Sequence, residues 1–245
     1  MSNKIEIVGI IPSRYGSTRF EGKPLIDIGG KTMIERVYLQ AKRANLLSQV
    51  IVATDDERIF NAVKQFGGEV VMTKAEHLNG TERCAEVAQN INADFIINIQ
   101  GDEPFIQPEQ IDLLAFTFIE NQNIQIATLI KKQEFSAALQ NPARIKVAIN
   151  KNKEALYFSR SVIPFNRSGV ENETIYYKHL GIYGYAKNVL LDIVKLTPTP
   201  LEISESLEQL RWLENGYKIA CSETFHESIS IDTPEDLKEA LAQFL

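Results

Sequence analysis

The first half of this 245-residue chain alternates short apolar runs with stretches whose apolar residues recur at helical spacing. Residues 5–11 and 95–99 are nearly continuous apolar runs, which is typical of strands buried on both faces. In residues 32–43, Ile34 and Val37 begin an apolar stripe with the period of a helix. Strands separated by helices in this way predict parallel βαβ units. We therefore predict an α/β fold, a mostly parallel sheet flanked by helices, with its ligand crevice beyond the carboxyl ends of the strands.

The second half has a less regular pattern. Residues 145–149, 156–159 and 176–185 predict strands, and residues 205–215 predict a helix. A last helix is predicted after Thr233, because a threonine suited to N-capping precedes a proline and two acidic residues. The length of the chain suits one large domain with a smaller mixed part.

Composition restricts the partners that we expect. The net charge is −6, which disfavours nucleic acid and anionic membranes because both carry the same sign. No apolar run approaches the roughly 20 residues that span a bilayer, and the N-terminus lacks the pattern of a signal peptide. Cys84 and Cys221 are far apart and show no metal-ligand spacing. We therefore expect a cytoplasmic protein without membrane insertion.

Residues 12–25 directly follow the first predicted strand and combine the groups that a triphosphate requires. Backbone N–H groups near glycine, hydroxyl donors and cations all stabilise phosphate oxygens. The spacing matches neither a Walker A loop nor a dinucleotide-binding motif, and a solvated loop with incidental charges is the alternative. The segment contains Gly16, Gly22, Ser13, Ser17, Thr18, Arg14, Arg19 and Lys23.

Two aspartates are candidates for a magnesium site. Asp102 follows the strand predicted at residues 95–99, and Asp232 is expected to end a short strand just before the last helix. Mg²⁺ prefers oxygen ligands and commonly bridges one or two carboxylates and substrate phosphates. Each aspartate also has a simpler interpretation, as a solvent-exposed turn residue or a helix-capping residue.

Together these segments resemble the 3-deoxy-manno-octulosonate (Kdo) cytidylyltransferase family. The family pattern Ile-Pro-Ala-Arg-x-x-Ser-Thr-Arg-x-x-Gly-Lys-Pro-Leu aligns with residues 11–25, and the resemblance extends over residues 5–242. Ser13 and Gly16 replace alanines that are usual in the family, Glu21 replaces a usual proline, and Trp212 replaces a usual aliphatic residue. Further matching stretches are residues 53–56, 80–87, 100–104, 155–160, 178–185, 206–211 and 232–236.

The resemblance implies a sheet similar to that of nucleotide-diphospho-sugar transferases, and it implies site residues. Asp102 and Asp232 would hold Mg²⁺ and would act in catalysis together with Arg14 and Lys23. Arg160, His179, Tyr183, Glu208 and Gln209 would bind the sugar, with Arg160 or His179 supplying a cation for its carboxylate. The residues expected to contact CTP are Pro12, Arg14, Ser17, Arg19, Lys23, Arg83 and Gln100.

The activity implied by the resemblance is the transfer of CMP from CTP to Kdo, which releases pyrophosphate and activates Kdo for lipopolysaccharide synthesis. Residues 1–130 would bind the nucleotide, residues 131–225 would bind the sugar and form a homodimer through the region 197–217, and residues 226–245 would add a closing helix.

Other functions predict other residues. A cytidylyltransferase for sialic acid or an amino-substituted Kdo is the nearest alternative. A non-catalytic nucleotide sensor should lack a metal aspartate or the loop lysine, yet Asp102, Asp232 and Lys23 are present. A glycosyltransferase should carry Asp-x-Asp, whereas Glu103-Pro104 follows Asp102.

Overall fold

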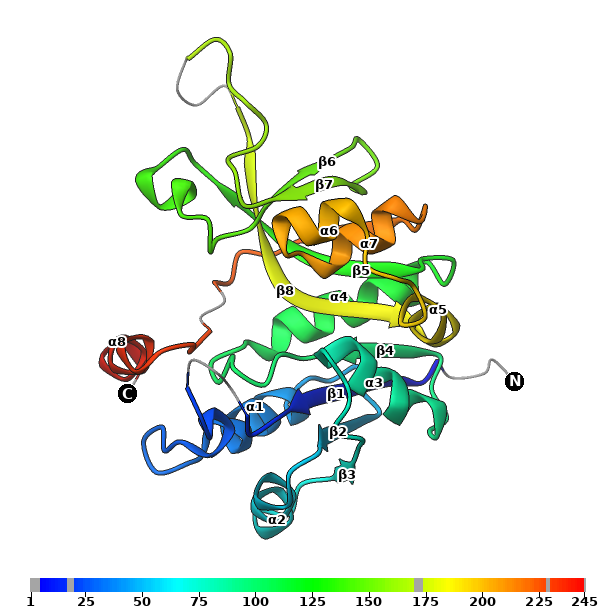
Figure 1. Cartoon of the computed structure of the whole chain (residues 1–245), viewed down its shortest axis with the longest axis vertical. Helices are drawn as coiled ribbons and strands as arrows, with labels where there is room; N and C mark the ends of the chain where they lie inside the picture. Colours follow the sequence, from blue (N-terminus) through cyan, green and yellow to red (C-terminus); the bar gives the residue numbers. More distant parts are fainter. Residues whose placement is uncertain (1–4, 17–19, 170–173, 228–229, 245) are drawn as a thin grey trace.

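The computed structural model of the chain describes residues 5–16, 20–169, 174–227 and 230–244. Within these residues a nine-stranded sheet has the order β3-β2-β1-β4-β8-β5-β9, and β6 and β7 pair beside β8 (Figure 1). The strands are β1 (Ile7–Ser13), β2 (Gln49–Thr54), β3 (Val70–Met72), β4 (Phe95–Asn98), β5 (Ile126–Gln133), β6 (Lys146–Ile149), β7 (Ala155–Ser159), β8 (Tyr176–Ala186) and β9 (Ile219–Glu223).

The four strands of the first half are all parallel, as the βαβ pattern predicts. β1 pairs in parallel with β2 and β4, and β2 pairs in parallel with β3. β8 then runs antiparallel between β4 and β5, and it also pairs with β6. This strand therefore joins the parallel part of the sheet to the mixed part, which confirms the predicted fold class.

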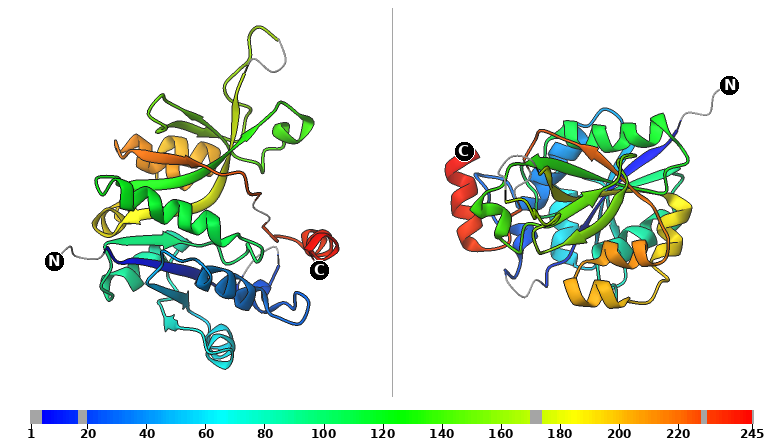
Figure 2. Two further views of the ribbon diagram at one scale, coloured as in Figure 1. Left: turned by 180° about the vertical axis from the view of Figure 1, so that it is seen from behind. Right: turned by 90° about the horizontal axis from the view of Figure 1, so that it is seen from above.

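Helices cover both faces of the sheet (Figure 2). Val8 and Ile10 of β1 pack on one face, and Ile7 and Ile11 pack on the other, so this strand is buried on both sides as predicted. The first face is covered by α3 (Gly80–Gln89), α5 (Lys187–Ile193) and α7 (Glu208–Glu214), and the second by α1 (Met33–Lys42), α2 (Glu57–Gln65) and α4 (Pro108–Glu120).

The C-terminal helix α8 (Pro234–Phe244) lies apart from the sheet, beside the end of the molecule that carries α1 (Figures 1 and 2). Ile231 and Ala240 pack there against Ile28 and Met33 in a small apolar cluster of their own. This cluster holds the segment around Asp232 close to the loop that follows β1. Among the described residues, none of the helices combines the length and apolar character needed to cross a bilayer.

Two sequence predictions were wrong in detail. The helix predicted over residues 205–215 begins only at Glu208, as α7, because Ser206 has a left-handed backbone with φ of 51° and separates it from α6 (Pro200–Glu205). The short strand predicted before Asp232 is not present in the described residues 230–232, which form neither a strand nor a helix. β5, β9, α5 and α6 had no sequence prediction.

Gly184 of β8 generates a stability prediction. A Cβ atom there would lie 3.0 Å from Cζ of Phe118 and 3.1 Å from Cδ1 of Ile97, inside a close-packed core. We expect Gly184→Ala to lower the free energy of unfolding by about 1–3 kcal/mol in urea denaturation, as overpacking does.

Gly181→Ala on the same strand is the matched control, because its nearest contact would be Cγ of Gln100 at 3.8 Å. This variant should change the free energy of unfolding by less than about 1 kcal/mol. Equal losses in the two variants would contradict the packing of α4 on β8.

Candidate active site

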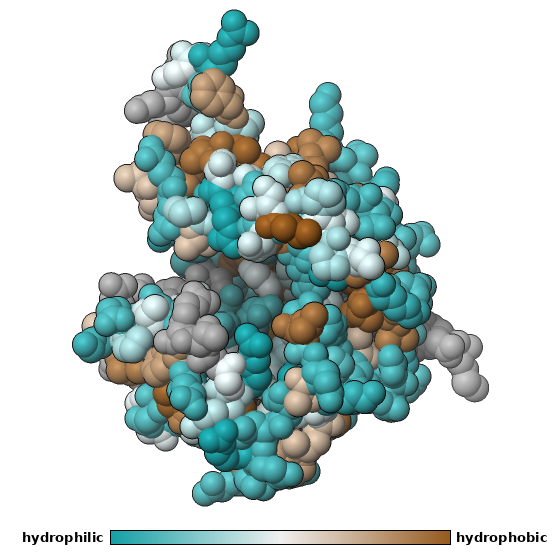
Figure 3. Space-filling model, in the orientation of Figure 1, coloured by the Kyte–Doolittle hydropathy of each residue, from teal (hydrophilic) through white to brown (hydrophobic). Residues whose placement is uncertain are grey.

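A pocket of about 340 Å³ lies beyond the carboxyl ends of β1 and β4, where the parallel strands predict a ligand crevice. Figure 3 shows hydrophilic side chains in the hollow between the lower part of the molecule, with α8, and the upper part, with β6 and β7. The lining residues are Pro12, Ser13, Arg14, Lys23, Pro24, His77, Leu78, Asn79, Gly80, Arg83, Gln100, Gly101, Asp102 and Asp232.

Lys23 lies between the two predicted metal ligands. Its Nζ atom is 2.8 Å from Oδ2 of Asp102 and 3.0 Å from Oδ1 of Asp232. Burial lowers the pKa of Lys23, but the charges and hydrogen bonds of the two carboxylates outweigh burial, so its pKa is raised above the ordinary value. The ammonium group is therefore charged at neutral pH and ties three distant segments together.

Backbone contacts bring the two aspartates to the same point. The N–H of Ile231 donates to the carbonyl of Asp102 over 2.9 Å, so the turn after β4 and the segment before α8 are directly bonded. Gly101 allows the same turn to approach β1, because a Cβ atom at this position would lie 2.9 Å from the carbonyl oxygen of Pro12. These two contacts place both carboxylates beside the loop that follows β1.

Arg83 projects from α3 into the pocket lining, and hydrogen bonds to residues outside the pocket fix its guanidinium. Its guanidinium donates to Oδ2 of Asp55 over 3.0 Å, to the carbonyl of Lys74 over 3.3 Å and to the hydroxyl of Thr73. Its side chain is almost completely buried, so these bonds fix its orientation. The matching stretch at residues 53–56 thus supplies Asp55, which positions Arg83.

The loop after β1 is anchored by a contact that the sequence did not predict. The guanidinium carbon of Arg58 lies 3.2 Å from the centre of the Tyr15 ring, a cation–π contact. Asp56 accepts two hydrogen bonds from the same guanidinium, at 3.0 and 2.7 Å. Arg58 therefore holds the base of the loop from α2.

His77 also lines the pocket and was not predicted as a site residue. Its Nε2 atom hydrogen-bonds Oε2 of Glu86, and Nδ1 lies 3.8 Å from Oε2 of Glu82. Glu82 and Glu86 occupy one face of α3 at a spacing of four residues, which is the only sequence signal that could have indicated this contact.

Some predicted nucleotide residues have other placements. Ser17 and Arg19 lie outside the described residues. Glu21, which replaces a proline of the family pattern, is exposed and is not among the lining residues; its charge acts on Arg58. Pro12, Arg14, Lys23, Arg83 and Gln100 all line the pocket.

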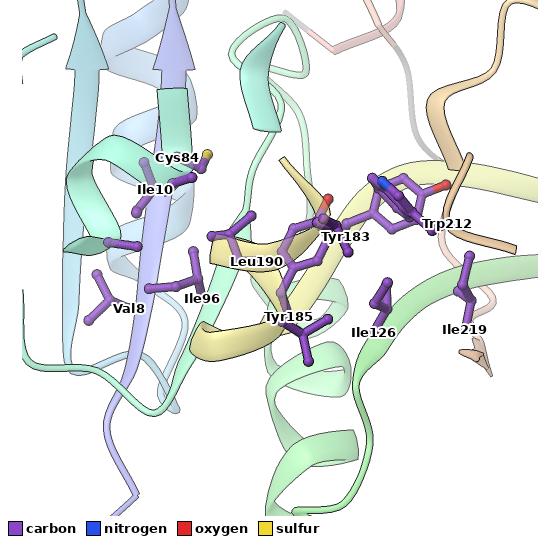
Figure 4. Close-up of a cluster of buried hydrophobic side chains, with 14 of the residues drawn as sticks. Val8, Ile10, Cys84, Ile96, Ile126, Tyr183, Tyr185, Leu190, Trp212 and Ile219 are labelled. Carbon is purple, nitrogen blue, oxygen red and sulfur yellow. The ribbon is translucent and has the colours of Figure 1, made fainter. Parts of the chain in front are cut away.

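Gln100 connects the pocket to β8, which carries two of the predicted sugar residues. Its Nε2 atom donates to the carbonyl of Gly181 over 3.0 Å. Tyr183 lies further along β8, with its ring packed edge-on against Trp212 of α7 (Figure 4). The five predicted sugar residues are not among those that line the 340 Å³ pocket; they lie on β7, β8 and α7 or at the ends of these elements.

His179 does not supply the expected cation. Burial, with a smaller effect of the Lys178 charge, lowers the pKa of His179 to about 3, so the ring is neutral at physiological pH. Its Nε2 atom lies 3.1 Å from the hydroxyl of Thr128. Of the two side chains expected to supply the cation, the structure therefore favours Arg160, because the ring of His179 is buried in the core.

Arg160 directly follows β7 and is half-buried. Its guanidinium donates to the carbonyls of Glu205, Pro142 and Ser206 over 2.6, 3.1 and 3.2 Å. It is the remaining candidate for the cation that pairs with a sugar carboxylate.

Glu208 and Gln209 begin α7. Burial raises the pKa of Glu208 to about 7, against the opposing effect of a hydrogen bond from Thr81. Gln209 is buried.

An open α/β sheet with a cationic loop, a nucleotide-sized pocket and two converging carboxylates defines the class of nucleotidyltransferases. The Cytidylyltransferase family profile matches residues 8–219. A solved structure described as CMP:2-keto-3-deoxy-manno-octonic acid synthetase complexed with CTP is 41% identical and has a TM-score of 0.92, with 97% of each chain covered. A cytidylyltransferase from Leptospira borgpetersenii is 21% identical with a TM-score of 0.65, covers 98% of this chain and 88% of the other, and shares the fold.

Sequence relatives identify the family within this class. A 3-deoxy-manno-octulosonate cytidylyltransferase from Parabacteroides distasonis is 54% identical over 248 residues, which cover 97% of this chain and 98% of the relative. Another, from Fusobacterium nucleatum, is 52% identical over 238 residues and covers 97% of this chain and 96% of the relative. The chain belongs to the 3-deoxy-manno-octulosonate cytidylyltransferase family.

The contact between Arg58 and Tyr15 generates a prediction for nucleotide binding. We expect Arg58→Ala to raise the KM for CTP about five-fold with a smaller change in kcat, because a cation–π contact of about 1 kcal/mol no longer orders the loop. Steady-state kinetics with CTP as the varied substrate measure this effect.

Arg43→Ala is the control, since Arg43 is exposed at the C-terminal end of α1 and its side chain bonds only Gln40 among the described residues. An unchanged KM for CTP in Arg58→Ala would show that the loop needs no support from α2.

Proposed function

We propose that this chain transfers CMP from CTP to 3-deoxy-D-manno-octulosonate, giving CMP-Kdo and pyrophosphate and thereby activating Kdo for lipopolysaccharide synthesis. The observation that carries the proposal is the meeting of Lys23 with Asp102 and Asp232 in a pocket beyond the ends of parallel strands. Family membership supports the choice of CTP and Kdo, since several relatives at about half identity carry that activity in their names.

The reaction is an in-line displacement at the α-phosphorus of CTP. The C2 hydroxyl oxygen of Kdo forms the new bond to phosphorus and loses its proton, while the bond to the β-phosphate oxygen breaks and its electron pair leaves with pyrophosphate. Such transfer depends on alignment and charge neutralisation more than on covalent help from the protein. Arg14 and Lys23 line the pocket and would neutralise the charge that develops on the leaving group.

Asp102 and Asp232 fit a magnesium ion by their chemistry. They contribute carboxylate oxygens that already converge on one cationic atom, Nζ of Lys23. No group of three or more acidic, histidine or cysteine side chains suited to a metal occurs in the described residues, so two carboxylates and substrate phosphates would share the ion. When bound, Mg²⁺ would polarise the α-phosphate as a Lewis acid.

The acceptor is expected to bind along β8 and α7. Gln100 bridges the nucleotide pocket to β8, and Arg160 is a cation for the carboxylate of the sugar. Tyr183, His179, Glu208 and Gln209 would complete this region, with His179 acting as a neutral group. Sialic acid and amino-substituted Kdo remain alternative acceptors, but the names of the relatives favour Kdo.

The physiological setting is part of the same proposal. Cys84 and Cys221 are buried free thiols, as a reducing compartment favours, and we place the reaction in the cytoplasm. Neither nucleic acid nor a membrane is expected to take part.

We also propose a homodimer formed by the mixed part of the chain. Leu201 and Ile203 are exposed in the region 197–217, with exposed fractions of 38% and 68%. Phe135 and Phe165, exposed by 47% and 85%, lie at a more apolar cavity of about 420 Å³. This second surface offers the larger aromatic contribution to an interface.

The function is tested by following pyrophosphate release with Mg²⁺, one nucleoside triphosphate and one sugar acid. We expect release with CTP and Kdo, and at least about ten-fold less with ATP, GTP or UTP or with N-acetylneuraminate. Equal release with all four nucleotides would contradict a cytidylyltransferase, and preference for N-acetylneuraminate would favour the alternative acceptor.

Asp102→Asn tests the role of the carboxylates. We expect kcat to fall at least about 100-fold, because removal of a carboxylate weakens both metal binding and charge stabilisation in the transition state. The thermal midpoint should stay close to that of the wild type, and Asp112→Asn, which changes an aspartate that accepts hydrogen bonds from Asn45 and Leu46, is the control. Full activity of Asp102→Asn would contradict the assignment of Asp102 as a magnesium ligand.

Phe165→Ser tests the dimer. Sedimentation velocity of the wild type should give a dimer, and Phe165→Ser should shift the population towards monomer because an exposed aromatic anchor is lost. Ile203→Ser, in the region 197–217, should keep a larger dimer fraction than Phe165→Ser does. If Ile203→Ser lowers the dimer fraction more than Phe165→Ser does, the interface lies in the region 197–217. A monomeric wild type would contradict the homodimer.

A further inference from the structure

A side-chain hydrogen bond joins α3 to α7. The hydroxyl of Thr81 donates to Oε2 of Glu208 over 2.8 Å, and the two residues are 127 positions apart in sequence. Thr81 lies in the first turn of α3 and Glu208 is the first residue of α7. The bond therefore connects the helix that borders the nucleotide pocket with the helix expected to border the acceptor.

The Thr81 end of this bond is fixed to the nucleotide pocket. Asn79 caps α3 by accepting a hydrogen bond from the backbone N–H of Glu82 over 2.8 Å. Gly80 packs so tightly that a Cβ atom there would lie 3.0 Å from Cγ of Pro12. Asn79, Gly80 and Arg83 line the pocket, and Thr81 itself is buried between them. Thr81 therefore cannot move without moving one wall of the pocket.

The Glu208 carboxyl depends on Thr81 for its orientation. Arg211, one helical turn further along α7, points instead to Glu202, with two hydrogen bonds of 2.6 Å, and to the carbonyl of Leu196 over 2.8 Å. Outside residues 1–4, 17–19, 170–173, 228–229 and 245, no other side chain forms a hydrogen bond with this carboxyl. Glu208 as a whole residue is half-buried rather than fully buried.

The surroundings of Glu208 bring the pKa of its carboxyl close to 7. Burial raises its pKa to about 7; the hydrogen bond from Thr81 and the charge of Arg211 lower the pKa, while the charges of Glu202 and Glu82 raise it. Tyr183 and Tyr185 of β8 and Cys84 of α3 also face it, all three with raised pKa values that leave them neutral at pH 7. The ionised fraction of Glu208 at pH 7 thus depends on the Thr81 hydroxyl.

We infer that Thr81 is a positioning residue of the transfer reaction, whose hydroxyl holds the Glu208 carboxylate at a fixed place relative to bound CTP. An acceptor that hydrogen-bonds to Glu208 is thereby aligned with the α-phosphate of CTP. The reason is that the first turn of α3 both borders the nucleotide pocket and holds the Glu208 carboxylate. The inference rests on the proposed function, in which Glu208 contacts the sugar.

Kinetics of Thr81→Val and Thr81→Ser test this role. We expect Thr81→Val to raise the KM for Kdo about ten-fold and to change the KM for CTP less than about two-fold. Thr81→Ser should have KM values close to those of the wild type, since serine keeps the hydroxyl. Thr117→Val is the matched control: this threonine also bonds through its hydroxyl, to Ser222 over 2.8 Å, but on α4 at the other face of the sheet.

The pH profile separates positioning from a purely structural effect. Glu208 must lose its proton to accept hydrogen bonds at both oxygens, so kcat/KM for Kdo should rise with pH through a value near 7. Loss of the Thr81 donor should raise the pKa of Glu208 and move this acid limb upward by about one pH unit. In a Glu208→Ala background, which lacks an acceptor for the Thr81 hydroxyl, the limb should vanish and Thr81→Val should change KM less than about two-fold. A Thr81→Val effect of the same size in both backgrounds would overturn the inference.

A titration independent of the acceptor distinguishes failure of this inference from failure of the proposed function. The ¹³C carboxyl resonance of Glu208, assigned with Glu208→Gln, should titrate at higher pH in Thr81→Val than in the wild type or Thr117→Val. An unchanged titration overturns the role of Thr81 whatever the acceptor is. A shifted titration in a protein that does not use Kdo supports the bond to Glu208 and overturns only the proposed acceptor.

Discussion

The contact of Lys23 with Asp102 and Asp232 is the interaction on which the site depends. It joins a loop after β1, a turn after β4 and the segment before α8, which are separated by up to 209 positions in sequence. Ion pairs that are partly open to solvent contribute little stability by themselves. The bond from Ile231 to Asp102 and the apolar cluster of Ile231 and Ala240 with Ile28 and Met33 keep the charges together.

The sheet explains why nucleotide and acceptor can be placed against each other. Parallel strands β1 and β4 end at the pocket, and antiparallel β8 continues the same sheet into the mixed part. Hydrogen bonds from Gln100 to Gly181 and from Thr81 to Glu208 connect the pocket and the helix beside it with that part. The acceptor region is therefore held relative to the nucleotide by the sheet and by side chains on either side of it.

Local patterns could predict what local forces determine. The buried runs of β1 and β4 and the stripe of α1 were predicted, because burial on one or both faces leaves a period in the sequence. The interruption between α6 and α7 at Ser206 was not predicted, since no residue pattern indicates that a serine will adopt a left-handed backbone. Lys23, Asp102 and Asp232 could be proposed from their motifs, whereas Arg58 on Tyr15 and His77 against Glu86 are contacts that only the folded chain creates. The low pKa of His179 likewise comes from burial in the folded chain, which its sequence context does not indicate.

The central claim is that Asp102 and Asp232 share one divalent cation next to the triphosphate. Anomalous diffraction from crystals grown with CTP and Mn²⁺, a magnesium substitute with strong anomalous scattering, tests it directly. The account predicts a manganese peak within about 2.0–2.3 Å of an oxygen of each aspartate, with the ammonium of Lys23 on phosphate oxygens. A manganese peak with CTP elsewhere, and Lys23 still bonded to both carboxylates, would contradict it.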